Sequence, residues 1–569
     1  METFDIRDLK HGGGKAAVKL RGRDVLLHNL YNRGTAFTQT ERDALGLQGL
    51  LPESVSTLED QAKRVHGFIQ QKTDPLEKLI GLDAVEMRNA VLYYRVLCDH
   101  IEEFLPVVYT PTIGLACQRF SRNFRRGRGL WITPEHRGKV AQVLRNAPYA
   151  DVRLIVVTDN ERILGLGDLG AGGMGIPVGK LALYTVGAGL HPSTCLPISL
   201  DVGTDNEELL ADPLYLGWRH RRLRGPEYDA LVEEFVAGVQ EVFPRAVLQW
   251  EDFKKNNAFN LLDRYRERLP SFNDDIQGTA AVAVAGLVAA ARISGVPMGE
   301  QRFLLLGAGA AGVGIARLLR SVLRGEGLSD EVIRERIALM DSEGLLLEGR
   351  EIRDPQKAEF VWTGEAAQRN DLTPMRARSL VEVVKAYKPH ALVGTSGTPG
   401  AFSEAVVRAM AAGVERPAIF PMSNPTHYSE ALPSDVIAWT NGKAIIATGS
   451  PFDPVAFDGR TFPISQGNNV YIFPGVGLGA ILSEARTISD EMLESASRTL
   501  AKLTSEARLA EGALFPRFSE LRSVSAEIAL EVAREAGRSG IGKAFSDDEL
   551  RARLEQTFWN PEYPELELA

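Results

Sequence analysis

Hydrophobic and polar positions follow two different periods along this chain. Between residues 36 and 128, apolar side chains recur at spacings of three and four, which predicts a largely helical N-terminal part. From residue 152 onward, short β-branched runs end at turn residues and alternate with amphipathic segments such as residues 225–243. This alternation is typical of an α/β unit with a parallel sheet.

Residues 302–323 predict a strand, a tight glycine turn and a helix. The turn has the G-x-G-x-x-G pattern, whose glycines let a pyrophosphate approach the backbone at the helix N-terminus. Further short strands follow, which favours a doubly wound sheet that binds a dinucleotide over a bare packing turn. The expected cofactor contacts are Gly307, Gly309, Ala310, Ala311 and Gly312.

Asp341 ends the next predicted strand. An acidic residue there binds ribose hydroxyls and repels a 2′-phosphate, so Asp341 favours NAD. It follows Gly307 by more than the usual ~20 residues because a charged insertion, residues 325–336, intervenes. Ser342 and Lys357 are an opposing signal, since they would accommodate the phosphate of NADP, and a turn-forming aspartate is the structural alternative.

Composition narrows the classes of function. A hydrophobic content of 44% and a charged content of 24% are those of a soluble globular protein. A net charge of -9 provides no basic surface for nucleic acid, and the apolar runs are too short and alanine-rich to span a membrane. Three widely spaced cysteines, and an N-terminus without an apolar leader, predict reduced thiols in a cytoplasm.

Two pairs of adjacent acidic residues are candidates for metal binding: Glu251–Asp252 and Asp274–Asp275. The second pair precedes an apolar helix expected over residues 276–293. Carboxylates without neighbouring cysteine or histidine suit Mg²⁺ or Mn²⁺ rather than Zn²⁺. Helix capping is the structural alternative, since aspartate is a favoured N-cap, and adjacent carboxylates are also common on surface loops.

A glycine-rich stretch at residues 156–180 combines two basic side chains with seven glycines. Arg162 is suited to bind a carboxylate through two parallel hydrogen bonds, and Lys180 would act as a base if it is desolvated. Tyr109 precedes a proline turn and is a candidate acid. The structural alternatives are a surface lysine and a core or capping tyrosine.

Taken together, these motifs resemble the malic enzymes in their order and spacing, from about residue 47 to residue 563. The segments that carry the resemblance are VVYTPTIG, VVTDNERILGLGDLGAGGMGIPVGK, LQWEDF, FNDDIQGTAA, FLLLGAGAAGVGIA, PMSNPT and QGNNVYIFPG. The resemblance implies oxidative decarboxylation of (S)-malate to pyruvate and CO₂ with NAD, or alternatively NADP, and with Mn²⁺ or Mg²⁺. It also implies a homodimer or homotetramer.

The resemblance assigns roles to individual residues. Lys180 would take the hydroxyl proton of malate, Tyr109 would protonate the enolpyruvate carbon, and Asp274 would orient Lys180. The implied metal ligands are Glu251, Asp252 and Asp275. The implied malate contacts are Arg162, Asn424, Asn468 and Asn469, of which Arg162, Asn424 and Asn469 also lie near the nicotinamide. For the paired asparagines, turn formation is the structural alternative.

The pattern and the resemblance together predict an α/β protein of four parts. These are a helical N-terminal domain (1–127), a central α/β domain (128–275 and 464–535), an inserted Rossmann-like NAD-binding domain (276–463) and a C-terminal arm (536–569).

Two alternatives of function remain at this point. Malolactic enzymes share the same motifs but convert malate to lactate and CO₂ with NAD retained, and an inactive regulatory scaffold is disfavoured because every expected catalytic residue is present. One departure concerns regulation: Arg64 and Arg88 match an activator site of some animal members, but Ser56 stands where those members have glutamate. This argues against activation by a dicarboxylate.

Overall fold

The computed structural model describes residues 15–163 and 165–568, which form two compact units. The first unit ends at Glu251 and also includes the C-terminal residues from Phe545, and the second is Asp252–Ala544. The four-part division expected from the sequence divides the chain differently from these two units, because its central domain would take residues from both, and it stays a prediction.

Helices dominate the N-terminal part of the first unit. α3 begins at a capping box in which Thr57 and Asp60 satisfy each other's backbone N–H groups, and it buries Val65 and Ile69. The predicted helical N-terminal region is therefore confirmed. Its main helices are α3 (Leu58–Gln70), α4 (Pro75–Arg88), α5 (Ala90–Asp99), α6 (Ile101–Val108) and α7 (Thr112–Gln118).

A parallel sheet follows in the first unit, with β2, β4, β3 and β5 in this spatial order. Its β-branched interior strand β3 is buried at every position, as expected where helices cover both faces. Because all four strands point the same way, their carboxyl ends lie at the same edge of the sheet. The glycine-rich loop follows β3 at this edge, and Glu251 follows β5 there. The strands are β2 (Leu130–Ile132), β3 (Leu154–Thr158), β4 (Cys195–Leu200) and β5 (Val247–Trp250); the main covering helices are α10 (Gly175–Ala188) and α12 (Pro226–Val242).

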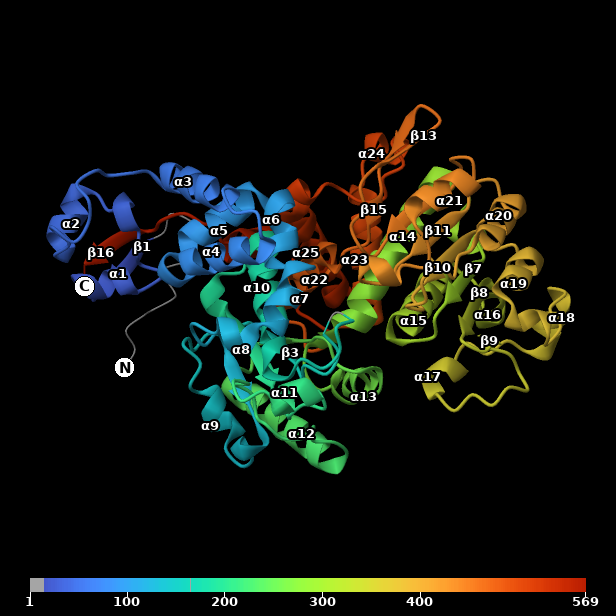
Figure 1. The fold of residues 1–569 in the computed structure, drawn as a ribbon, viewed down its shortest axis with the longest axis horizontal. Helices are drawn as coiled ribbons and strands as arrows, with labels where there is room; N and C mark the ends of the chain where they lie inside the picture. Colours follow the sequence, from blue (N-terminus) through green and yellow to red (C-terminus); the bar gives the residue numbers. More distant parts are fainter. Residues whose placement is uncertain (1–14, 164, 569) are drawn as a thin grey trace. The chain divides into compact units, whose positions relative to one another are not determined.

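A seven-stranded sheet organises the second unit within the described residues (Figure 1). Its order is β15-β12-β11-β10-β7-β8-β9, and only β9 runs antiparallel to its neighbour. This is the predicted Rossmann-like parallel sheet. The strands are β7 (Phe303–Leu306), β8 (Ile337–Asp341), β9 (Gly344–Leu345), β10 (Ala391–Gly394), β11 (Ala418–Pro421), β12 (Ile445–Thr448) and β15 (Ser465–Gln466).

Apolar helices form the rest of the second unit. α14 (Thr279–Ser294) packs on α15 (Ala310–Gly325) and α23 (Asp490–Leu503), and Figure 1 shows α22 (Phe473–Leu482) beside α25 (Leu521–Arg538). The segment that contains α14 is long and apolar enough to cross a membrane, but 78% of its most apolar window is buried within the protein. Its composition therefore reflects a core helix.

Candidate active site

Lys180 and Glu251 form a buried ion pair in the first unit. Lys180 lies on α10, Glu251 directly follows β5, and their side chains are 1% and 3% exposed. Lys180 Nζ lies 3.1 Å from Glu251 Oε1. Removing either partner would leave an uncompensated buried charge, so the two groups depend on each other. Lys180 is not a surface lysine.

Tyr109 lies beside this pair. It is the residue after α6, it is 6% exposed, and its ring centroid lies 5.1 Å from Lys180 Nζ, within cation–π range. The two segments approach closely because residue 179 is glycine. A Cβ at Gly179 would lie 2.9 Å from the carbonyl oxygen of Val108.

Glu251 is held by Gln249, which is in turn held by Tyr184, and neither residue was predicted from the sequence. Gln249 Nε2 donates to Glu251 Oε2 at 2.7 Å, and the Tyr184 hydroxyl donates to Gln249 Oε1 at 2.5 Å. Side chains two positions apart on a strand face the same side. The spacing of Gln249 and Glu251 was therefore the available signal for this contact.

Asp252 and Asp275 come together in the second unit. The Asp252 N–H donates to Asp275 Oδ2 at 2.8 Å, and a carboxylate oxygen of each lies within 4.8 Å of the other. Asp252 has a φ of 55°, a left-handed conformation that is uncommon for a residue with a side chain. Glu251, the third predicted ligand, directly precedes Asp252 in the sequence. The donor set is carboxylate only, as Mg²⁺ and Mn²⁺ prefer.

Asp274 lies in a π-helical turn, Asp274–Gly278, that leads into α14. Asn469 Nδ2 donates to Asp274 Oδ2 at 2.8 Å. Asn273 is the N-cap, because its Oδ1 accepts the N–H three residues further on at 3.0 Å. The cap is therefore supplied by the residue before the two aspartates. The contact of Asp274 with Lys180 stays a prediction.

The other predicted substrate residues of the second unit differ in their surroundings. Asn468 Oδ1 accepts from the Val470 N–H at 3.0 Å, which is the turn contact considered as its structural alternative. Asn424 is exposed and its Oδ1 accepts from the Ser450 hydroxyl at 2.5 Å. The roles of Asn424, Asn468 and Asn469 toward malate and the nicotinamide stay predictions.

The glycine turn after β7 has the geometry that a pyrophosphate site needs. Gly307 has a φ of 115°, which glycine alone adopts readily, and a Cβ at Gly312 would lie 1.8 Å from the Gly307 carbonyl oxygen. Gly309 is the N-cap of α15 and has no side chain to occupy the first-turn N–H groups. Those groups, which include Ala310 and Ala311, are suited to a phosphate.

Asp341 is the last residue of β8, and its carboxylate pairs with two basic side chains. Lys357 Nζ and Arg350 Nη2 each lie 2.8 Å from its carboxylate, which also accepts the Glu343 N–H at 3.0 Å in a turn. Burial by itself raises the pKa of Asp341, but the hydrogen bonds from Lys357 and Arg350 outweigh it and lower the pKa below its ordinary value. The acid that favours NAD and the lysine that would favour NADP are therefore paired.

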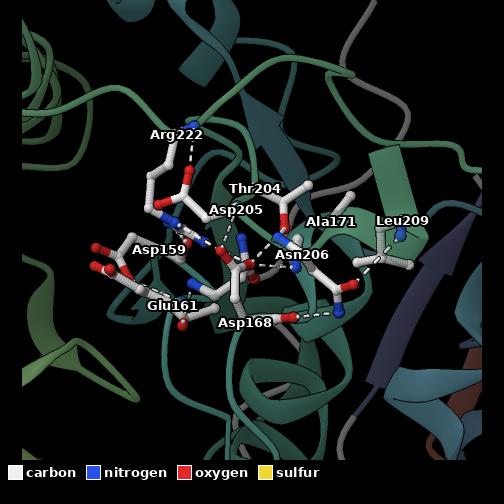
Figure 2. A network of polar contacts seen from close by, with 12 residues as sticks. Asp159, Glu161, Asp168, Ala171, Thr204, Asp205, Asn206, Leu209 and Arg222 are labelled. Carbon is white, nitrogen blue, oxygen red and sulfur yellow. Dashed lines mark hydrogen bonds and ion pairs between the residues drawn. The ribbon is translucent and has the colours of Figure 1, made fainter. Parts of the chain in front are cut away.

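Arg162 lies on an exposed part of the glycine-rich loop. The loop returns on itself at a bridge between Ile163 and Gly167, and Ile163 is fully buried. Figure 2 shows the polar network at the two ends of this loop, in which Arg222 donates to the carbonyl oxygen of Asp159 and to the carboxylate of Asp168. Neither Asp168 nor Arg222 was predicted as a site residue from the sequence.

At the position of the animal activator site, Arg64 Nη2 donates to the Ser56 hydroxyl at 3.0 Å, and Arg88 Nη1 donates to a carbonyl of its own helix. Ser56 thus accepts a hydrogen bond from Arg64 but does not provide the negative charge of a glutamate.

Two family models match the chain in sequence. The N-terminal domain of malic enzyme matches residues 86–266, and the NAD binding domain of malic enzyme matches residues 276–537. The chain belongs to the malic enzyme family. Within this family it is 46% identical to the NAD-dependent malic enzymes of Vibrio campbellii, over 547 residues, and of a Shewanella species, over 543 residues. Each match covers 95% of this chain and 96% of the relative.

Solved structures of the family share the fold. The malic enzyme of Entamoeba histolytica aligns with a TM-score of 0.55 at 24% identity, covering 92% of this chain and 93% of that one. The malic enzyme of Pyrococcus horikoshii aligns with a TM-score of 0.53 at 24% identity, covering 80% and 89%. The predicted family and the mixed α/β fold are confirmed.

Proposed function

We propose that this protein is an NAD-dependent malic enzyme, which converts (S)-malate to pyruvate and CO₂ and reduces NAD. The observation that carries the proposal is similarity to NAD-dependent malic enzymes over 95% of the chain. The buried group of Lys180, Glu251 and Tyr109 supports it, because a desolvated lysine beside a tyrosine provides a base and an acid.

The metal proposal rests on three acidic residues that are adjacent in the chain or hydrogen-bonded to one another. Glu251, Asp252 and Asp275 would hold one Mn²⁺ or Mg²⁺, as their oxygen-only chemistry suits. A divalent cation bound there would polarise the malate hydroxyl and stabilise the enolate formed when CO₂ leaves. Gln249 would keep the Glu251 carboxylate turned toward its ligand position.

Two proton transfers fall to residues of the first unit. Lys180 would accept the hydroxyl proton while a hydride leaves malate C2 for the nicotinamide. After loss of CO₂, Tyr109 would donate its phenolic proton to C3 of enolpyruvate, and pyruvate results. Asp274 would orient Lys180.

Binding contacts complete the proposal. The residues that would hold malate are Arg162, Asn424, Asn468 and Asn469. Of these, Arg162, Asn424 and Asn469 would also face the nicotinamide. The turn from Gly307 to Gly312 would hold the pyrophosphate and Asp341 the adenosine ribose. We further propose a cytoplasmic homodimer or homotetramer, which sedimentation of the purified protein would test.

The deciding experiment follows NADH absorbance with malate, NAD and Mn²⁺ while pyruvate and lactate are measured. We expect one NADH for each pyruvate and a lower rate with NADP. Disappearance of malate with lactate formation and no NADH would instead identify a malolactic enzyme. No consumption of malate would overturn both.

A further inference from the structure

A single buried arginine holds both ends of the loop that carries Arg162 (Figure 2). Arg222 lies just before α12, and its side chain is 1% exposed. Its Nε and Nη2 donate to the two carboxylate oxygens of Asp168 at 3.0 and 2.7 Å. Its Nη1 donates to the carbonyl oxygen of Asp159 at 2.7 Å. One rigid guanidinium therefore fixes the distance between residues 159 and 168.

Each end of the loop is fixed further by its own contacts. The Asp168 carboxylate also accepts from the Thr204 hydroxyl at 2.8 Å and from the N–H groups of Gly170 and Asp205 at 3.0 and 2.9 Å. At the other end, Asp159 Oδ2 accepts from the Tyr228 hydroxyl at 2.7 Å. Such a connected, buried network has few alternative arrangements.

The segment between these ends is held mainly through the residues beside Arg162. Arg224 Nη2 donates to Glu161 Oε1 at 2.8 Å, and the Glu161 N–H donates to Asp159 Oδ1 at 3.1 Å. Ile163 packs in the core, and its N–H donates to the Gly167 carbonyl at 2.9 Å. Arg162 itself is exposed, as are Gly165 and Leu166. Its direction therefore depends on how the two ends of the loop are anchored.

We infer that Arg222 is a positioning residue for malate binding, which acts through Arg162. This inference rests on the proposed function, in which Arg162 binds a malate carboxylate. Lysine cannot replace Arg222, because a single ammonium cannot donate in a fork to Asp168 and reach the Asp159 carbonyl at the same time.

The test compares Arg222→Lys with Arg221→Lys in steady-state kinetics of the full chain. Arg221 is the matched control, since its side chain is 61% exposed and pairs only with the exposed Glu207 among the described contacts. We expect Arg222→Lys to raise the KM for malate about 10- to 100-fold with kcat changed less than about threefold, because misplacing a substrate-binding group by ~1 Å has effects of this size. The circular dichroism spectrum should not change.

A double-variant cycle separates positioning from a general loss of structure. In an Arg162→Ala background, Arg222→Lys should cause no further rise in KM, because the residue through which it acts is gone. Equal rises in both backgrounds, or an unchanged KM in the single variant, would overturn the inference. Asp168→Asn removes the charged acceptor in the same shape and carries the same test if Arg222→Lys does not fold.

Failure of the proposed function has a different signature. If the parent protein does not oxidise malate, the function is wrong. If the parent is active and Arg162→Ala leaves the KM for malate unchanged, the role of Arg162 is wrong and the inference about Arg222 falls with it. If Arg162→Ala raises KM and Arg222→Lys does not, only the inference is wrong.

Discussion

At the scale of single residues, the second unit assigns different surroundings to two adjacent aspartates. Asp275 accepts from the backbone of Asp252, whereas Asp274 accepts from the side chain of Asn469. Because Asn273 already caps the helix, removing the charge of Asp275 removes no cap. Metal binding and helix stability are therefore separable at this position.

The first prediction concerns Asp275→Asn. We expect Mn²⁺ affinity to fall by at least about 100-fold and turnover to fall with it, since loss of a ligand costs no less than loss of a supporting contact. The free energy of unfolding should change by about 1 kcal/mol or less. Calorimetric Mn²⁺ titration and thermal melting of the metal-depleted protein measure the two quantities.

Ser329→Ala is the control for this prediction, because Ser329 caps α16 (Asp330–Arg336) through the Val332 N–H. It should lower stability by about 1 kcal/mol and leave Mn²⁺ binding unchanged. Normal Mn²⁺ affinity in Asp275→Asn would remove Asp275 from the ligand set.

At the scale of elements, the closeness of α10 to the end of α6 decides where Lys180 and Tyr109 meet. Gly179 permits this approach, and it directly precedes Lys180 on α10. Interiors are close-packed, so an added methyl group there has to displace backbone.

The second prediction follows from this contact. Gly179→Ala should cost about 1–3 kcal/mol of stability and lower kcat, because the new Cβ moves Lys180 away from Tyr109. Gly67→Ala on α3 is the matched control. A Cβ at Gly67 has no atom within 4 Å, so this change should stabilise the protein by about 0.5–1 kcal/mol. Equal effects of the two substitutions on kcat would contradict the argument.

The third prediction concerns the pH dependence of stability at His191, which packs against Trp559 near the C-terminus. Burial lowers the pKa of His191 to about 4 from its ordinary value of 6.5, and its ring packs edge-on against Trp559 at 5.2 Å between centroids. Between pH 4 and 6.5 the unfolded chain binds a proton at His191 that the folded chain does not, so stability rises with pH in this window. The contribution is complete above pH 6.5 and is lost as pH falls toward 4.

We expect a slope of about 1 kcal/mol per pH unit from this group in the first unit. His191→Asn keeps an acceptor for the Ser193 N–H and has no titrating ring. It should therefore reduce the difference in thermal midpoint between pH 5 and pH 8. An unchanged difference would show that other groups determine the acid sensitivity.

At the scale of the whole molecule, the C-terminal residues from Phe545 onward are part of the first unit. β16 (Glu565–Leu568) pairs with β1 (Lys15–Val18), and the Trp559 N–H donates to the Gly189 carbonyl at 2.7 Å. The Tyr563 hydroxyl donates to Gln61 at 2.7 Å. The C-terminal residues thus stabilise the unit that the N-terminal residues form.

The fourth prediction is that a chain ending at residue 544 loses stability in the first unit and retains NAD binding in the second. Scanning calorimetry with and without NAD measures this, because a ligand raises the midpoint only of the unit that it binds. Tyr563→Phe, which loses the hydrogen bonds with Gln61 and Asn89, should cost about 1–3 kcal/mol. A truncated chain with an unchanged melting profile would contradict this role of the C-terminal residues.

The family, the fold class and the nucleotide turn were determined by the sequence alone. The reason is that each depends on contiguous residues: helical and strand periods, a glycine turn directly after β7, and long motifs in a fixed order. The spacing of Gly307, Gly309 and Gly312 needs no distant partner to be recognised.

Only the tertiary structure decided which side chains hold one another. The Lys180–Glu251 pair, the bond from Asn469 to Asp274 and the fork from Arg222 to Asp168 join residues that are 54 to 195 positions apart in the sequence. Such contacts form when strand ends and helices pack, and the local pattern of residues carries no record of them. The contacts of Arg222 with the loop therefore could not be predicted from the sequence, because Arg222 and the loop come together only in the folded chain.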